Sequence, residues 1–245
     1  LFSTPSHVPA NLANRGLPMR LLAIISMGHL SVVTSDVSIT QFSDLRGKPM
    51  LGFFRHDMPD IVFRVLARKE GIEPDRDLQM TYVQTPMEAA QLLVAGRADT
   101  AILHEPSATA AIMMAQHQGR TLRRAISLQQ VWGVHFGRPR IPMAGVALHQ
   151  GLIDDSPEVL AALRAGLVPA KDWVLANRAE AAKLAERTMA IRPPVFERSL
   201  DHFHIDVVSA QAMRPELEVF YRALLELSPD TLGGKLPPDD FYLDL

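Results

Sequence analysis

Apolar runs of strand length alternate with segments of helical period in the stretch 48–106, around which the rest of the chain is organised. The strand-length runs are 49–54, 80–83 and 100–103. The segments between them carry apolar residues at helical spacing and stop at glycines: 59–70 before Gly71, and 85–95 before Gly96. Strands joined by helical crossovers of this length pair in parallel. The pattern therefore predicts an open α/β sheet.

Polar residues follow each of these predicted strands. Arg55, His56 and Asp57 come after the first strand, Thr85 after the second, and Glu105 after the third. Ligands of open α/β sheets bind at the carboxyl ends of the strands. These five residues are therefore candidates for ligand binding.

Two helices of this stretch have recognisable start signals. Pro59 stands where the fixed φ of proline favours a first helical turn. The segment Thr85-Pro-Met-Glu88 combines an N-cap hydroxyl, a first-turn proline and the glutamate of a capping box. Asp57 precedes Pro59, so its carboxylate is better explained by capping of the helix than by ligand binding.

The flanking segments predict a second α/β region. Residues 1–6 resemble a strand end that enters helix 7–14, and Thr4 or Ser6 either caps this helix or presents its positive end to a ligand. Further strands are predicted at 21–25, 146–148 and 203–208. Further helices are predicted at 108–118, 156–174 with a kink or break at Pro169, 178–189 and 215–227. The segment Arg192-Pro-Pro194 is expected to end the helix at 178–189.

Two extended connectors flank the central stretch. They cover residues 26–38 and about 132–142. Two crossing segments allow two lobes to hinge through small dihedral changes. Met27 and His29 on the first connector are candidates for lining a cleft, and Trp132 either stacks on a ligand ring or belongs to the core.

Length and charge exclude several classes of protein. The chain has 245 residues, with 27 acidic and 25 basic side chains, a net charge of −2 and no basic run, which argues against a nucleic-acid surface. No apolar run reaches transmembrane length. Cysteine is absent, which excludes disulfides and thiolate chemistry. Leu1 is not a natural start, so we expect a processed or truncated amino terminus.

The stretch that begins with Asp44-Leu-Arg-Gly-Lys48 resembles a known family. A strand, a polar turn and a helix ending in Lys69-Glu-Gly-Ile72 follow it, and the pattern continues through residues 89–99 to a strand that leads into Glu105-Pro106. It is similar to the second lobe of the periplasmic substrate-binding proteins of ABC importers, in the nitrate, sulfonate, taurine and thiamine-pyrimidine subgroup. The resemblance is most specific over residues 44–106 and rests elsewhere on the order of elements.

This resemblance implies an α/β, two-lobed type II periplasmic-binding-protein fold, with parallel-sheet lobes, helices on both faces and the ligand clamped between the lobes. Lobe one would comprise residues 1–38 with 138–245, and lobe two residues 39–137. Relatives begin with a strand–helix–strand unit that we expect to precede Leu1. They often carry a Gly-Ser pair where this chain has Arg55-His-Asp-Met58, which implies a different ligand.

Arg55 is the strongest single candidate for ligand binding. Its guanidinium offers a bidentate fork for a carboxylate, sulfonate or phosphate. The alternative is a surface ion pair with Asp57 or Asp60. Glu105 either accepts a hydrogen bond from a ligand amine or holds the loop before Pro106 in place.

Other kinds of site have little support. His202 and His204 fall on one face of a predicted strand, but no third metal ligand stands at a characteristic spacing. The chain lacks the Gly-x-Ser-x-Gly elbow of serine hydrolases and the Gly-x-Gly-x-x-Gly loop of dinucleotide-binding proteins. We therefore expect neither a metal nor a cofactor.

Two classes of function remain. The resemblance implies a monomeric solute receptor, periplasmic or extracellular and free or lipid-anchored, that delivers a small anionic or heteroaromatic molecule to an ABC permease of the inner membrane. The alternative is an enzyme on the same fold that acts on a cofactor precursor, as in menaquinone or thiamine-pyrimidine synthesis. Its acid or base would come from His29, His56 or Glu105.

Overall fold

The computed structural model describes residues 1–245 and divides into two compact units. Unit 1 comprises Leu1–Gly28, Ile141–Pro193 and His204–Leu245, and unit 2 comprises His29–Arg140 and Pro194–Phe203. Each unit has its own sheet. None of the helices combines the length and the apolar character that crossing a membrane requires.

Unit 2 contains a five-stranded sheet with the order β5-β4-β6-β3-β7. Its strands are β3 (Leu30–Thr34), β4 (Pro49–Phe53), β5 (Gln79–Val83), β6 (Thr100–His104) and β7 (Arg123–Ser127). Strand β4 pairs in parallel with β5 and β6, which confirms the sheet predicted for residues 48–106. β3 runs antiparallel to both β6 and β7.

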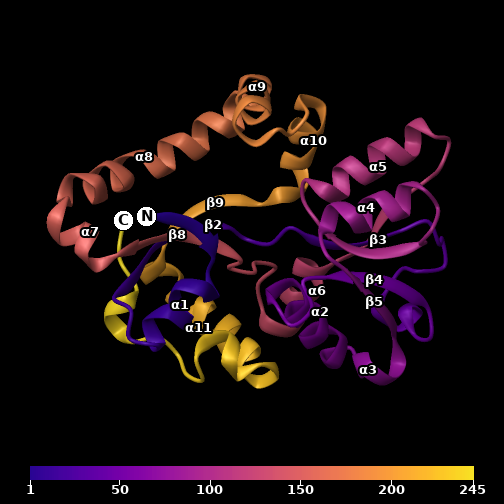
Figure 1. The fold of residues 1–245 in the computed structure, drawn as a ribbon, viewed down its shortest axis with the longest axis horizontal. Helices are drawn as coiled ribbons and strands as arrows, with labels where there is room; N and C mark the ends of the chain where they lie inside the picture. Colours follow the sequence, from indigo (N-terminus) through magenta and orange to yellow (C-terminus); the bar gives the residue numbers. More distant parts are fainter. The chain divides into compact units, whose positions relative to one another are not determined.

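Helices cover both faces of this sheet (Figure 1). They are α2 (Met58–Lys69), α3 (Pro74–Asp77), α4 (Pro86–Val94), α5 (Ser107–His117), α6 (Leu128–Phe136), most of α10 (Pro193–Phe203) and the short 3-10 helix η1 (Phe42–Leu45). On the face of α4 and α5, Leu51, Ala101 and Leu103 pack against buried residues such as Leu93 and Ala111. α2 and α6 lie on the opposite face (Figure 1).

Unit 1 contains a four-stranded sheet with the order β1-β8-β2-β9. Its strands are β1 (Phe2–Pro5), β2 (Met19–Ser26), β8 (Ala144–His149) and β9 (Ile205–Ser209). All neighbours pair antiparallel, unlike the parallel lobe that we expected. The reason is that β8 inserts between β1 and β2, which run in the same direction but never meet.

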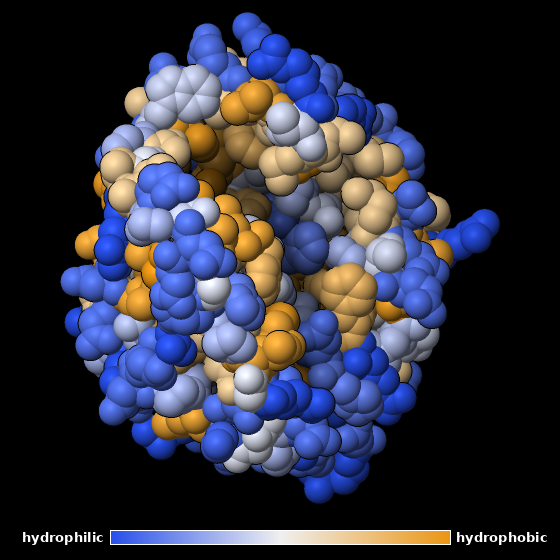
Figure 2. Space-filling view, turned by 60° about the vertical axis from the view of Figure 1, so that its left-hand side comes forward, coloured by the Kyte–Doolittle hydropathy of each residue, from blue (hydrophilic) through white to orange (hydrophobic).

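The helices of unit 1 pack on this sheet and on one another. They are α1 (His7–Asn14), α7 (Gln150–Asp155), α8 (Pro157–Ala176), α9 (Arg178–Met189), α11 (Ala210–Leu227) and the 3-10 helices η2 (Pro229–Leu232) and η3 (Asp239–Phe241). Pro169 stands inside α8, which continues through it instead of breaking. Large apolar side chains of α8 and α9 stay exposed, among them Trp173 and Met189. Hydrophobic side chains also appear among hydrophilic ones on the face drawn in Figure 2.

The first predicted connector contains a strand of the unit 2 sheet. Leu30–Thr34 forms β3, which lies between β6 and β7, so residues 29–38 belong to unit 2. The second connector begins inside α6, since Trp132 is helical. The boundaries expected after residues 38 and 137 therefore fall after Gly28 and Arg140.

The region 193–204 also differs from the prediction. Pro193 begins α10 where we expected only a helix end, and His202 lies in that helix. His204 follows as a left-handed cap with φ of 50°. Because β9 starts only at Ile205, His202 and His204 do not share a strand face.

Thr85 caps α4 as predicted. Its Oγ1 accepts a hydrogen bond from the backbone N–H of Glu88 at 3.1 Å, and the Glu88 carboxylate accepts one from Gln84 N at 2.9 Å. We expect Thr85→Ala to lower the free energy of unfolding by about 1 kcal/mol, because one N-terminal N–H loses its partner. Chemical denaturation measures this change, with Thr85→Ser as the control that keeps the cap. Equal midpoints for Thr85→Ala and the parent would contradict the capping role.

Candidate functional site

The carboxyl edge of the unit 2 sheet collects most of the predicted site residues. Arg55, His56 and Asp57 follow β4, Thr85 follows β5, and Glu105 follows β6. These three strands run in parallel, so their carboxyl ends meet at one edge. His29 reaches the same edge, because Leu30 of the antiparallel strand β3 pairs with His104 at the end of β6.

The turn after β4 has an unusual backbone conformation. Phe54 and His56 have φ angles of 48° and 65°, in the left-handed region that non-glycine residues rarely adopt. Two hydrogen bonds hold the turn: Asp57 N donates to Phe54 O, and His56 N donates to the Asp60 carboxylate, both at 2.9 Å. The Asp57 side chain accepts from Met58 N at 2.6 Å and stands at the N-cap of α2, as the capping interpretation predicted.

A buried network of ionic side chains is hydrogen-bonded to this turn through Asp60. The side chain of Asp60 is 1% exposed and accepts hydrogen bonds from Arg64 Nε at 3.1 Å and from the Tyr82 hydroxyl at 2.6 Å. Arg64 donates in turn to Tyr82 Oη and to Asp75, both at 2.9 Å. Burial, reinforced by Asp60, raises the pKa of Tyr82 to about 12. The network therefore holds a fixed charge pair and a neutral phenol under the turn.

Arg55 projects from the turn without an acidic partner. Its guanidinium carbon lies 5.2 Å from the centroid of the Tyr82 ring, within the range of a cation–π contact. The predicted alternative, an ion pair with Asp57 or Asp60, is not formed, because Asp60 pairs with Arg64 and Asp57 caps α2. The exposed guanidinium keeps its hydrogen-bond donors for another molecule.

Glu105 holds the loop after β6. Its side chain is 2% exposed, and Oε1 accepts from Arg124 Nε at 2.8 Å and from Arg124 Nη2 at 2.6 Å. Oε2 accepts from the backbone N–H and the hydroxyl of Thr109. Both carboxylate oxygens are thus engaged inside the unit, as the loop-holding interpretation of Glu105 described.

A row of rings follows the same edge. The ring of His29 stacks on Phe203 at 4.9 Å and meets His104 edge-on at 5.7 Å. His104 also meets Phe53 edge-on at 5.6 Å. Sequence reasoning did not select Phe203 or Tyr82, and it placed His104 at this strand end without naming it as a ligand-binding residue. The position of His104 directly before Glu105, at a strand end, was the one signal that pointed to it.

The remaining predicted residues lie elsewhere. Thr4 pairs with Gly145 inside the unit 1 sheet. Ser6 is the N-cap residue of α1 but makes no side-chain cap; it is fully buried and its hydroxyl donates to Pro142 O at 2.5 Å. Met27 is 3% exposed and belongs to unit 1. Trp132 is 3% exposed and stacks on Phe136 at 3.9 Å, as its core interpretation predicted.

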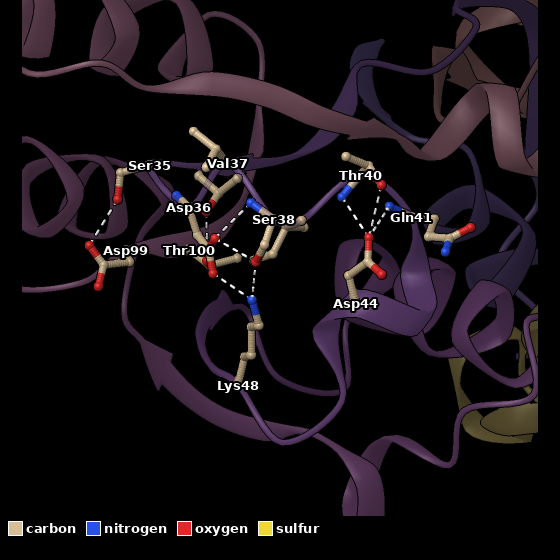
Figure 3. Close-up of polar contacts among 12 residues, drawn as sticks. Ser35, Asp36, Val37, Ser38, Thr40, Gln41, Asp44, Lys48, Asp99 and Thr100 are labelled. Atoms are coloured by element: carbon tan, nitrogen blue, oxygen red, sulfur yellow. Dashed lines mark hydrogen bonds and ion pairs between the residues drawn. The ribbon is translucent and has the colours of Figure 1, made fainter.

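A hollow of about 650 Å³ lies at the opposite, amino edge of the same sheet. Residues 48–51 and 97–100 line it, with Asp36 and Thr81. Lys48 points at the Asp36 carboxylate and the Ser38 hydroxyl, and Asp99 accepts from Ser35 at 2.8 Å (Figure 3). The Lys48 and Ser38 hydrogen bonds lower the pKa of Asp36.

The charges of Lys48 and Asp36 neutralise each other. Their ion pair and the Ser35–Asp99 hydrogen bond hold the segment after β3 in place. The carboxyl edge differs, because four helices, α2, α4, α5 and α6, begin there and bring their positive ends to it beside Arg55. We therefore place the candidate site at the carboxyl edge, although the hollow of about 650 Å³ is at the amino edge.

Comparison with known proteins supplies the family. A model described as the NMT1-like family matches residues 28–189, which is more than half of the chain. The chain belongs to the NMT1-like family. No curated protein matches it.

Several solved structures share the fold of this NMT1-like chain. An ABC transporter protein from Parabacteroides distasonis has 22% identity and a TM-score of 0.76, with 98% of this chain and 79% of that chain covered. The periplasmic aliphatic sulphonate binding protein SsuA from Escherichia coli has 17% identity and a TM-score of 0.69, covering 98% and 80%. The periplasmic nitrate-binding protein NrtA from Synechocystis PCC 6803 has 16% identity and a TM-score of 0.61, covering 90% and 66%. The resemblance drawn from the sequence and the predicted α/β periplasmic-binding-protein fold are thereby confirmed, whereas the parallel sheets expected in both lobes are not found.

Proposed function

We propose that this NMT1-like chain is the solute-binding receptor of an ABC importer. Its solute is a small anionic or heteroaromatic molecule that binds at the carboxyl edge of the unit 2 sheet. The family match and the shared fold support the receptor role, since the similar structures include proteins described as binding sulfonates and nitrate. The observation that carries the assignment of the site is the unpaired guanidinium of Arg55.

The electrostatics of the edge favour a negative group. Helix N-termini concentrate positive potential and unpaired N–H groups, and α2 begins directly after the turn that carries Arg55. Asp57 and Asp60 contribute negative charge, but Asp60 is neutralised by Arg64 inside the unit. A sulfonate, carboxylate or phosphate can accept two parallel hydrogen bonds from Arg55.

The state of Glu105 favours a receptor over an enzyme. An enzyme would need a side chain placed to exchange a proton with its substrate. Glu105 already accepts hydrogen bonds from Arg124 and Thr109 on both oxygens, so its carboxylate has a structural task. Glu105 is therefore not available as the acid or base of the enzyme alternative.

The receptor role implies a partner and a location. The partner is an ABC permease of the inner membrane, to which a receptor delivers its solute. The corresponding location is periplasmic or extracellular, either free or held by a lipid anchor. A net charge of −2 and the absence of a basic run fit a receptor that works without nucleic acid. We propose that it acts as a monomer.

A binding screen tests this function. We expect at least one small acid from a panel of alkanesulfonates, hydroxyalkanesulfonates, short carboxylates and nitrate to raise the melting temperature, because a ligand that binds only the folded state stabilises it. Pyrimidines in the same panel test the heteroaromatic alternative. Calorimetric titration then gives Kd for each hit. No shift with any member at millimolar concentration, together with turnover of a panel member, would contradict the receptor role.

A further inference from the structure

The two ring nitrogens of His104 are in different situations. Nδ1 lies 2.7 Å from the carbonyl oxygen of Glu105. A carbonyl oxygen only accepts hydrogen bonds, so Nδ1 must carry the hydrogen. Nε2 makes no hydrogen bond within the chain, and His104 is only partly buried.

The ring is held in its neutral form. Burial lowers the pKa of His104 below its usual value, against the smaller opposing effect of Glu105. In a neutral imidazole whose Nδ1 is protonated, Nε2 carries a lone pair and acts as an acceptor. The edge therefore presents one fixed acceptor besides the donors of Arg55.

The surroundings of this acceptor are rings. His29 and Phe53 both meet His104 edge-on, with interplanar angles of 84° and 74°. Phe53 in turn meets the ring of Phe54 edge-on at 5.3 Å. Phe54 is 45% exposed, so an apolar surface borders the acceptor.

We propose that Nε2 of His104 accepts a hydrogen bond from the bound solute, which is therefore a small acid that also carries an N–H or O–H donor. This inference rests on the proposed function, in which Arg55 takes the acidic group. Nitrate and unsubstituted alkanesulfonates carry no donor and would leave the Nε2 lone pair without a partner when they displace water. Hydroxy- and amino-substituted sulfonates or carboxylates satisfy both groups.

Matched pairs of acids test the proposal. Calorimetric titration of the parent protein compares ethanesulfonate with 2-hydroxyethanesulfonate, and propionate with 3-hydroxypropionate, at pH 7.5 (about one pH unit above the usual histidine pKa). We expect the hydroxylated member of each pair to bind about tenfold more tightly, since an unpaired acceptor in a desolvated site weakens binding by about that factor.

Two variants test whether the preference for the hydroxylated acid depends on His104. In His104→Phe the ratio within each pair should fall to about one, because the plain acid no longer leaves an acceptor unpaired and the hydroxylated acid no longer finds one. His117→Phe, at the exposed end of α5, is the control that should keep the parent ratio. If His104→Phe fails to fold, ¹⁵N spectra of the parent imidazole replace it: the Nε2 resonance should move with 2-hydroxyethanesulfonate and stay in place with ethanesulfonate.

The outcomes separate this inference from the function on which it rests. Equal affinities within the pairs would overturn the donor requirement and leave the receptor role intact. A preference that survives in His104→Phe would overturn the assignment to His104. Binding by neither member of either pair would overturn the anion site itself, and this inference with it.

Discussion

Replacing Asp60 with alanine is expected to lower the free energy of unfolding by about 3–5 kcal/mol, because it leaves the buried guanidinium of Arg64 without its buried carboxylate partner. The side chains of Asp60 and Arg64 are 1% and 8% exposed, so water cannot take the place of the lost partner without opening the unit. The hydroxyl of Tyr82 and the backbone N–H of His56 lose an acceptor at the same time. Urea denaturation measures this loss as a shift of the unfolding midpoint. The slope of the unfolding free energy against urea concentration should stay unchanged.

Asp75 supplies the matched control for this experiment. It is the other carboxylate on Arg64, at 2.9 Å, but its side chain is 65% exposed. Asp75→Ala should therefore change stability by less than about 1 kcal/mol. Equal losses for the two variants would show that the network does not depend on burial, and would contradict the position assigned to Asp60 beneath the turn.

Replacing Arg55 with alanine is expected to weaken binding of an acidic solute by about 2–5 kcal/mol, since its guanidinium supplies the charge at the carboxyl edge that no protein group neutralises. Stability should change little, because Arg55 is exposed and its one contact in the chain is with the Tyr82 ring. Calorimetric titration with the tightest acid of the panel gives the loss, and denaturation of the ligand-free variant confirms that the fold is retained.

Arg97 provides a control at the opposite edge of the same sheet. It is exposed, makes no ion pair, and lines the hollow at the amino edge. Arg97→Ala should leave the affinity unchanged. The reverse result, normal binding by Arg55→Ala and weak binding by Arg97→Ala, would move the site to the amino edge.

Local patterns predicted the central sheet and its helix starts well. The strands and helices of residues 48–106 repeat their apolar residues at short spacing, and the cap at Thr85 is a contact between neighbours in sequence. Arg55 was predicted to lie at the carboxyl edge of the sheet, because helical crossovers imply that the strands they join run in parallel. The ring of Tyr82 beneath it could not be predicted, because strand alternation does not say which aromatic side chain packs on which arginine.

Pairings between distant residues account for the errors. Leu30–Thr34 has the apolar residues of a strand but was interpreted as a connector, because its partners begin some 70 residues later in β6 and β7. Pro193 and Pro194 were taken as a helix end, although prolines in the first turn begin helices equally well. Ser6 was expected to cap α1, but the Pro142 carbonyl, which is remote in sequence, takes its hydroxyl.

Backbone amide shifts during titration with 2-hydroxyethanesulfonate test most directly whether the carboxyl edge of unit 2 is the binding site. In a deuterated sample, the largest shifts within unit 2 should fall on residues 54–58, 85–88 and 104–109, which border that edge. Ethanesulfonate should move the first of these groups and have a smaller effect at residue 104. Largest shifts at residues 36–50 and 97–100, around the amino-edge hollow, would contradict the proposed site.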